Sequence, residues 1–444
     1  MTDSPHADRP LRWAPGWVLA FVALWPLPGP AEGVAALGAI AAVAVLLLRR
    51  FRGGTALLSQ EAWALTAVLF LGYWLPQAVA AIDAGQPARA LRGAAFDLKF
   101  LPFLWLGAAA VAHAQGRRIV FQGLALLAGL WTLDALLQAL LGHSLLFAAL
   151  DAGVTAVQGR SACAADEVNL RGYVAGIFGP CNPKLGLVLA ALAPFAIVAA
   201  ARRWGVGGWW VSAVAIGIAV LLAGSRAAWI AYAIVLALSG WKLLGGRQLL
   251  LAFAVGAGAL FALGAASPEL RERLERTALA LEADGAGVDA ALSGRTRVWA
   301  AASCMALSHP FNGVGVRGFR DAFPACDPEP GAPLAWGEGP AHHAHQIVLE
   351  IASETGAFGL LMWLAAAALA WRAWRFADAA ARERARPAMI SLVATVFPLN
   401  THLAVYSTFW GGVVMLVAAL YAGSLLAVDR DVAAETGGRP APPR

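Results

Sequence analysis

Three of the chain's eight histidines, His342, His343 and His345, lie close together directly before an apolar stretch. The surrounding residues 339–359 read GPAHHAHQIVLEIASETGAFG. Because imidazole titrates near neutral pH, a histidine at the edge of a low-dielectric region suits a general base or a group that stabilises charge. Two other interpretations stay open. His343 and His345 could chelate zinc, although no nearby Cys or His completes a ligand set, or they could be structural residues at an interface.

Basic residues form a second group that could do chemistry. Arg226, in AGSRAAWIA, is flanked by apolar sequence on both sides, and charges at bilayer depth are costly and tend to mark function. A guanidinium binds two phosphate oxygens at once, so a converging set suggests a phosphate-bearing lipid head group. The alternative is contact with anionic lipid or pairing with loop acids, which is favoured for residues 271–276. The candidates are Arg89, Arg92, Lys99, Arg160, Arg171, Lys184, Arg226, Arg295, Arg297, Arg317 and Arg320.

The composition indicates which kind of fold must hold these side chains. Of the 444 residues, 60% are hydrophobic and 14% are charged, whereas soluble domains carry roughly 25% charged residues. Apolar runs recur that are long enough to cross a bilayer, and in lipid such runs must be helices. We therefore predict an all-α polytopic membrane protein without a cleavable signal peptide. The twelve predicted spans are 13–29, 31–48, 62–82, 98–114, 119–141, 185–201, 205–223, 227–244, 248–266, 356–373, 388–408 and 409–427.

Arginine-rich short loops predict the orientation, because basic residues collect on the cytoplasmic side. They place both termini inside and two long segments, 142–184 and 267–344, outside. Residues 1–266 then hold spans one to nine, 345–428 hold an interfacial helix and spans ten to twelve, and 429–444 form an inner tail. The inner basic residues are Arg49, Arg50, Arg52, Arg117, Arg118, Arg202, Arg203, Lys242, Arg247, Arg372, Arg375, Arg382, Arg384 and Arg386.

All four cysteines fall in the two long outer segments. Disulfides persist in oxidising compartments, so we expect Cys163–Cys181 and Cys304–Cys326 bridges, the alternative being four independent thiols. Within the larger segment, residues 267–285 and the stretch before Pro310 carry helix start and stop signals, which predicts a mostly helical outer cap. From His345 to Gly356 the sequence predicts an amphipathic helix at the outer interface.

Four segments carry a family resemblance: GSRAAW, SGRTRVW, HPFNGVGVRGF and HAHQIVLEIASETGAFG, in that order on the predicted outer face. Their order resembles the bacterial O-antigen ligase and O-antigen polymerase superfamily, most sharply over residues 224–360. Members of this superfamily carry an outer-edge Arg, an S-G-R…W segment, a P-x-x-G-x-G-x-x-x-F turn and an H-N-x-x-L…E-x-G-x-x-G segment. Gln346 stands where Asn is commoner. The likeness matches Arg226, Arg295 and His345 to the functional positions, with His343 as the alternative base.

The resemblance implies a GT-C-like fold and an O-antigen ligase of the bacterial inner membrane. Such enzymes transfer a glycan from undecaprenyl pyrophosphate to a sugar hydroxyl of lipid A–core on the periplasmic face. They invert the anomeric carbon and need no metal ion, cofactor or nucleoside triphosphate. Further substrate contacts are then expected from Arg89, Arg92, Lys99, Lys184, Arg297 and His343.

Three alternatives stay open. An O-antigen polymerase or a protein O-glycosyltransferase of the same superfamily would differ only in the acceptor. A transporter would need intramembrane acids or broken spans. Asp134 is the one clear mid-span acid, and Pro398-Leu399-Asn400 is a possible break.

Overall fold

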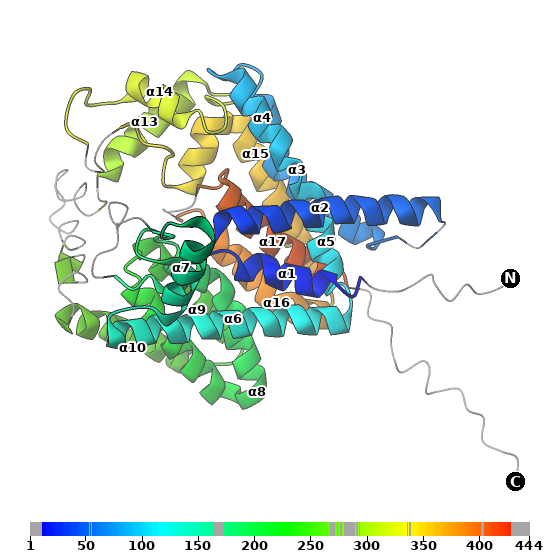
Figure 1. The fold of residues 1–444 in the computed structure, drawn as a ribbon, viewed down its shortest axis with the longest axis vertical. Coiled ribbons are helices and arrows are strands. Elements are labelled where there is room, and N and C mark those ends of the chain that lie inside the picture. Colours follow the sequence, from blue (N-terminus) through cyan, green and yellow to red (C-terminus); the bar gives the residue numbers. More distant parts are fainter. Residues whose placement is uncertain are drawn as a thin grey trace, which may run out of the picture.

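The computed structural model is helical, and the residues that it describes contain no strand (Figure 1). Eight helices in this part of the chain are long and apolar enough to cross a membrane, which confirms a polytopic α-helical membrane protein. The described residues are 11–52, 54, 56–163, 173–266, 294–334, 336, 339–400 and 404–427, with isolated positions between 271 and 292. The eight are α2 (Pro28–Phe51), α3 (Gln60–Ala80), the stretch Pro87–Val111, α6 (Ala114–Leu141), α8 (Leu185–Leu222), α10 (Gly246–Ala266), α15 (Ile347–Phe376) and α17 (Thr408–Leu425).

The difference between eight spans and the twelve predicted has structural reasons. Helix α8 contains two predicted spans, 185–201 and 205–223, which Gly205 joins across a kink with φ 63°. Three further predicted spans coincide in part with helices too short for the length criterion. These are α1 (Ala14–Ala23), α9 (Arg226–Gly240) and α16 (Ala379–Thr395). The stretch Pro87–Val111 comprises α4 (Pro87–Asp97) and α5 (Phe100–Val111).

The loops predicted to lie inside gather at one end of the bundle, which we call the inner end. Leu11, Leu57, Ala112 and Leu426 belong to one apolar cluster there, although they come from four separate connections or ends. The Arg202 guanidinium of α8 donates to the Glu383 carbonyl of α16 at 2.7 Å, joining two helices in stretches that the sequence predicts as arginine-rich inner loops. The opposite, outer end carries the cap and the histidine segment.

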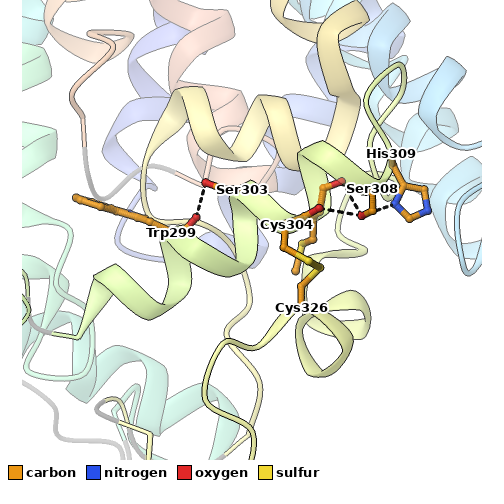
Figure 2. The surroundings of a disulfide bond; sticks show 7 residues. Trp299, Ser303, Cys304, Ser308, His309 and Cys326 are labelled. Carbon is orange, nitrogen blue, oxygen red and sulfur yellow. Dashed lines mark hydrogen bonds between the residues drawn. A yellow bond between two sulfur atoms is a disulfide. The ribbon is translucent and has the colours of Figure 1, made fainter.

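The outer cap contains two short helices, α13 (Arg295–Ser308) and α14 (Phe319–Cys326), which lie together at the upper left of Figure 1. Helix α13 ends directly before His309-Pro310, as the stop signals predict. A disulfide between Cys304 and Cys326, with 5.6 Å between the Cα atoms, ties the two helices together (Figure 2). The helix predicted over 267–285 falls outside the described residues.

Helix α15 breaks at Gly356, which has φ 63° and a non-helical backbone. The break leaves two carbonyls, of Ser353 and Glu354, and two amides, of Ala357 and Phe358, that would bond one another in an unbroken helix. The loop 310–315 occupies these groups instead. It donates from Val314 and Gly315 to the carbonyls at 2.9 and 3.1 Å, and its Pro310 and Phe311 carbonyls accept from the amides at 2.9 and 3.0 Å.

Three predictions about the outer end need correction. The span 388–408 is wrong beyond Thr395, where α16 ends, because Pro398 cannot donate a helical hydrogen bond. The second disulfide is absent: no bond joins Cys163 to Cys181. Asp151 instead fixes the turn before Cys163, accepting from Ser161 Oγ at 2.7 Å. The first turns of α15 are also not water-facing.

The unpredicted helix α7 (Leu145–Gln158) accounts for the acid in span five. Asp134 is buried and accepts from Ser144 Oγ at 2.6 Å and from the Leu146 amide at 3.0 Å. Ser144 in turn caps the helix by accepting from Phe147. The carboxylate that favoured a transporter is therefore bound to the start of a structural helix.

The break at Gly356 predicts a large cost for a side chain there. We expect Gly356→Ala to lower the stability of the protein by about 2 kcal/mol or more, because alanine disfavours positive φ. The added Cβ would also overlap the backbone of Phe311. Thermal unfolding in detergent measures the loss. Gly129→Ala is the control, since a Cβ at this α6 position meets nothing within 4 Å; equal melting temperatures for both variants would contradict the role of the break.

Candidate active site

His345 has a strained backbone that is held from both sides. It is one of two non-glycine residues with positive φ among the described residues, at φ 52°, and such strain collects at functional sites. The preceding Ala344 carbonyl accepts from Trp299 Nε1 of α13 at 3.1 Å. The following Gln346 caps α15, accepting from the Leu349 amide at 2.6 Å, and donates to the Pro398 carbonyl at 2.7 Å. These bonds fix the backbone on both sides of His345, and therefore the position from which its side chain extends.

The two ring systems of the histidine segment lie together. The centroids of the His343 and His345 rings are 3.9 Å apart, and both residues are half-buried, whereas His342 is exposed. The structure therefore keeps both candidate bases at one place and separates His342 from them. The described residues contain no group of three His, Cys, Asp or Glu side chains arranged for a metal ion.

The starts of α8 and α9 lie near this segment. The Ile347 amide donates to the Asn400 carbonyl at 3.3 Å, and Asn400 lines a small cavity with Leu187 and Ala231. Leu187 is one turn beyond Lys184, and Ala231 lies little more than one turn beyond Arg226. Both basic residues therefore lie at the same end of the bundle as the histidine segment.

Arg226 and Arg295 each occupy the first position of a helix. Ser225 caps α9 by accepting from the Ala228 amide at 3.4 Å, and Gly294, with φ 73°, turns the chain into α13. Arg295 is four residues before Trp299, so the two share one face of α13, the face toward the histidine segment. The N-terminal end of a helix carries partial positive charge and favours anions.

Lys184 is held directly before α8, with Nζ 4.2 Å from the centroid of the Phe409 ring. Burial lowers its pKa, since desolvation disfavours the charged form, while Cys181 opposes this shift. An anion bound beside the ammonium would raise the pKa again, so Lys184 suits a site for a negatively charged group.

A buried polar network at this end centres on Arg317, which the sequence predicts only as one of the outer-face basic candidates. Arg317 also has positive φ, 62°. Its amide donates to Glu354 at 2.9 Å, and its guanidinium donates to the Tyr406 carbonyl at 3.1 and 3.2 Å. Glu350 and Glu354, predicted to face the interface, are buried. Their spacing in E-x-x-x-E places both carboxylates on one face of the helix, and this was the signal in the sequence that could have indicated the network.

Several predicted substrate contacts are bound within the protein. Arg297 makes a two-pronged ion pair with Asp327, at 2.7 and 2.6 Å, and donates to three carbonyls of the cap. Arg89 pairs with Asp321 and donates to the Arg317 carbonyl at 2.9 Å. Lys99 pairs with Glu32 at 2.6 Å, and Arg92 is exposed on α4. Arg297, Arg89 and Lys99 thus have ion-pair partners within the protein.

A family model described as O-antigen ligase matches residues 211–364, a range that includes Arg226, Arg295 and His345. The match confirms the resemblance predicted from the four segments. Comparison with curated proteins finds no match.

The Arg297–Asp327 pair predicts a pH-dependent contribution to the stability of the cap. The guanidinium lowers the pKa of Asp327, mainly through its hydrogen bond. The contribution is therefore complete above the ordinary aspartate pKa, about 4, and is lost as pH falls through the lower folded-state value. We expect Asp327→Asn to lower the melting temperature by a few degrees at pH 7, and the difference from wild type to close in acid. A constant difference across the titration would contradict the pairing.

Proposed function

We propose that this chain, whose residues 211–364 match the O-antigen ligase family, is an O-antigen ligase of the bacterial inner membrane. It transfers a glycan from undecaprenyl pyrophosphate to a sugar hydroxyl of lipid A–core, at the periplasmic face. The observation that carries the proposal is the strained His345, anchored on both sides, at the same end of the bundle as the helix starts that bear Lys184 and Arg226. The family match and the apolar helices support a lipid-linked saccharide as substrate.

The proposed glycosyl transfer requires two things of the protein, and the basic residues and His345 can provide both. A polyprenyl pyrophosphate is already an activated donor, so the enzyme needs to stabilise the leaving diphosphate and orient the acceptor. The acceptor oxygen bonds to the anomeric carbon as the bond from that carbon to the pyrophosphate oxygen breaks. The hydroxyl proton passes to the imidazole of His345, and undecaprenyl pyrophosphate leaves as the anion. Attack from the face opposite the leaving group inverts the anomeric carbon.

In the proposed reaction, three basic residues at helix starts stabilise the leaving group. Arg226 and Arg295 bring guanidinium groups at the first positions of α9 and α13, and Lys184 stands at the start of α8. The partial charges of the three helix ends add to the side chains. In the proposed reaction, these groups stabilise charge that exists mainly in the transition state and product, which is the interaction that accelerates a reaction.

The central test is the replacement of His345. We expect His345→Ala to reduce transfer about 10²–10⁴-fold, the usual contribution of a general base, while donor binding persists. The assay uses purified protein, glycan on undecaprenyl pyrophosphate, and lipid A–core. His342→Ala is the matched control, because this exposed histidine precedes the anchored segment. Wild-type transfer by His345→Ala, together with loss in His343→Ala, would assign the base to His343.

Lysine substitutions at Arg226 and Arg295 provide a second test of the proposed function. We expect Arg226→Lys and Arg295→Lys each to reduce transfer about tenfold or more, because an ammonium cannot reproduce the two-pronged guanidinium contact with phosphate. Folding should persist, as judged by thermal unfolding. Arg118→Lys, an exposed position at the inner end, should transfer at the wild-type rate. Full activity of both test variants would make the two arginines structural.

A further inference from the structure

One buried acid of α15, Glu350, has no part in the proposed reaction. Its side chain is only 1% exposed. One oxygen, Oε1, accepts from the Tyr406 amide at 3.3 Å. The other, Oε2, is buried and has no hydrogen-bond partner among the residues that the structure describes. An ionised carboxylate can accept several hydrogen bonds, and a charge that lacks them away from water is costly. One long hydrogen bond is therefore poor support for a charge at this position.

A second buried carboxyl makes a charge on Glu350 still less favourable. Glu354 is 2% exposed and follows Glu350 by one helical turn, so the two side chains share one face of α15. Two negative charges on that face would repel each other, and the repulsion is strong where water is excluded. Two carboxyl groups in such a site keep a proton between them.

The segment before α17 offers Glu350 no compensating charge. The phenol of Tyr406 is the titratable group of this segment that acts on Glu350, and phenols are neutral at pH 7. Beyond it lies another acid, because Tyr73 contacts the Tyr406 ring and donates to Asp97 at 3.3 Å. The Arg317 guanidinium donates to the Tyr406 carbonyl at 3.1 and 3.2 Å. This cation thus pairs with the main chain instead of with Glu350.

The neighbouring cations favour Glu354 as the charged member of the pair. The Arg317 amide donates to Glu354 at 2.9 Å. The positive charges that act on this carboxyl are those of Arg317, Arg320 and Arg89. The proton that the pair keeps therefore resides on Glu350.

Glu350 also belongs to the contacts that hold the start of α15 against the segment between α16 and α17. The Gln346 side chain and the Ile347 amide donate to carbonyls of this segment at 2.7 and 3.3 Å. One turn after Gln346, Glu350 accepts from the Tyr406 amide. Because His345 directly precedes this helix start, the three contacts together fix the backbone from which its imidazole extends.

We propose that Glu350 is a positioning residue for the transfer reaction and that it works as an uncharged carboxylic acid. An ionised Glu350 would repel Glu354 and would require water or a cation at a buried oxygen, which would separate α15 from the segment before α17. The proton thus keeps the helix start, and His345 before it, in place. The role in transfer rests on the proposed function, whereas the protonation of Glu350 does not.

Infrared spectroscopy of the purified full-length protein at pH 7 tests the proton directly, because a protonated carboxyl and a carboxylate absorb at different frequencies. We expect the difference spectrum between wild type and Glu350→Gln to show the loss of a protonated carboxyl band. Glu61→Gln is the matched control, since this exposed residue of α3 should lose a carboxylate band instead. A carboxylate band lost from Glu350→Gln would overturn the inference.

Two substitutions test the positioning role. Gln has the shape of an uncharged Glu, so we expect Glu350→Gln to melt at the wild-type temperature and to transfer glycan at the wild-type rate. Glu350→Met keeps the length of the side chain but removes the oxygen that accepts from Tyr406. We expect it to lower kcat about tenfold or more, the scale of a misplaced reacting group, with the KM for the donor little changed.

The two kinds of measurement separate this inference from the proposed function. The infrared spectrum and the melting temperatures decide whether Glu350 carries a proton even if wild type transfers no glycan to lipid A–core. Loss of folding in Glu350→Gln would show that the charge is required and would overturn the inference. With active wild type, a wild-type kcat in Glu350→Met would refute the positioning role.

Discussion

The outer end of this protein depends on one exchange of backbone hydrogen bonds. Gly356 interrupts α15, and the loop 310–315 bonds to both sides of the interruption. A bare break at this depth would leave four polar groups unpaired, which is costly away from water. Because the loop supplies all four partners, the cap is joined to a membrane helix by main-chain bonds that no side-chain substitution removes directly. Gly313 packs so closely on Glu354 that a Cβ would overlap its backbone.

The same junction also positions the charged network. Directly after the loop, Arg317 has a left-handed backbone and donates its amide to Glu354, while its guanidinium reaches the Tyr406 carbonyl. Tyr406 belongs to the irregular segment between α16 and α17, whose carbonyls at Pro398 and Asn400 accept from the start of α15. Irregular backbone is tolerated at membrane depth where protein groups satisfy it. Cap, histidine segment and the start of α17 are thus fixed together.

The sequence predicts most of the helices because apolar length and arginine-rich loops are local signals. It also places the boundary between the interfacial helix and span ten near Gly356, and the end of α13 before Pro310, since glycine and proline act on their own backbone. It fails for the part of the predicted span 388–408 beyond Thr395, where α16 ends. The Pro398 and Tyr406 carbonyls that follow accept from Gln346 and Arg317, which are far away in the sequence. Helix α7 was missed although Ser144 caps it locally; the structure adds a distant partner, since Ser144 also donates to Asp134 in another helix. Partners of this kind leave no periodic pattern.

The candidate site likewise contains residues that the sequence predicts and contacts that only the fold reveals. The proposed site residues Arg226, Arg295 and His345 are named through the family resemblance of the segments that contain them. Arg226 and Arg295 begin helices, and His345 directly precedes the cap residue of α15. The sequence could not distinguish Arg297, two residues from Arg295, because only the fold brings Asp327 to it. A basic residue on the outer face therefore indicates substrate binding only when the fold leaves it beside the reacting groups. Two residues further along α13, Trp299 holds the Ala344 carbonyl, so one short helix both stabilises the cap through Arg297 and sets the position of the proposed base.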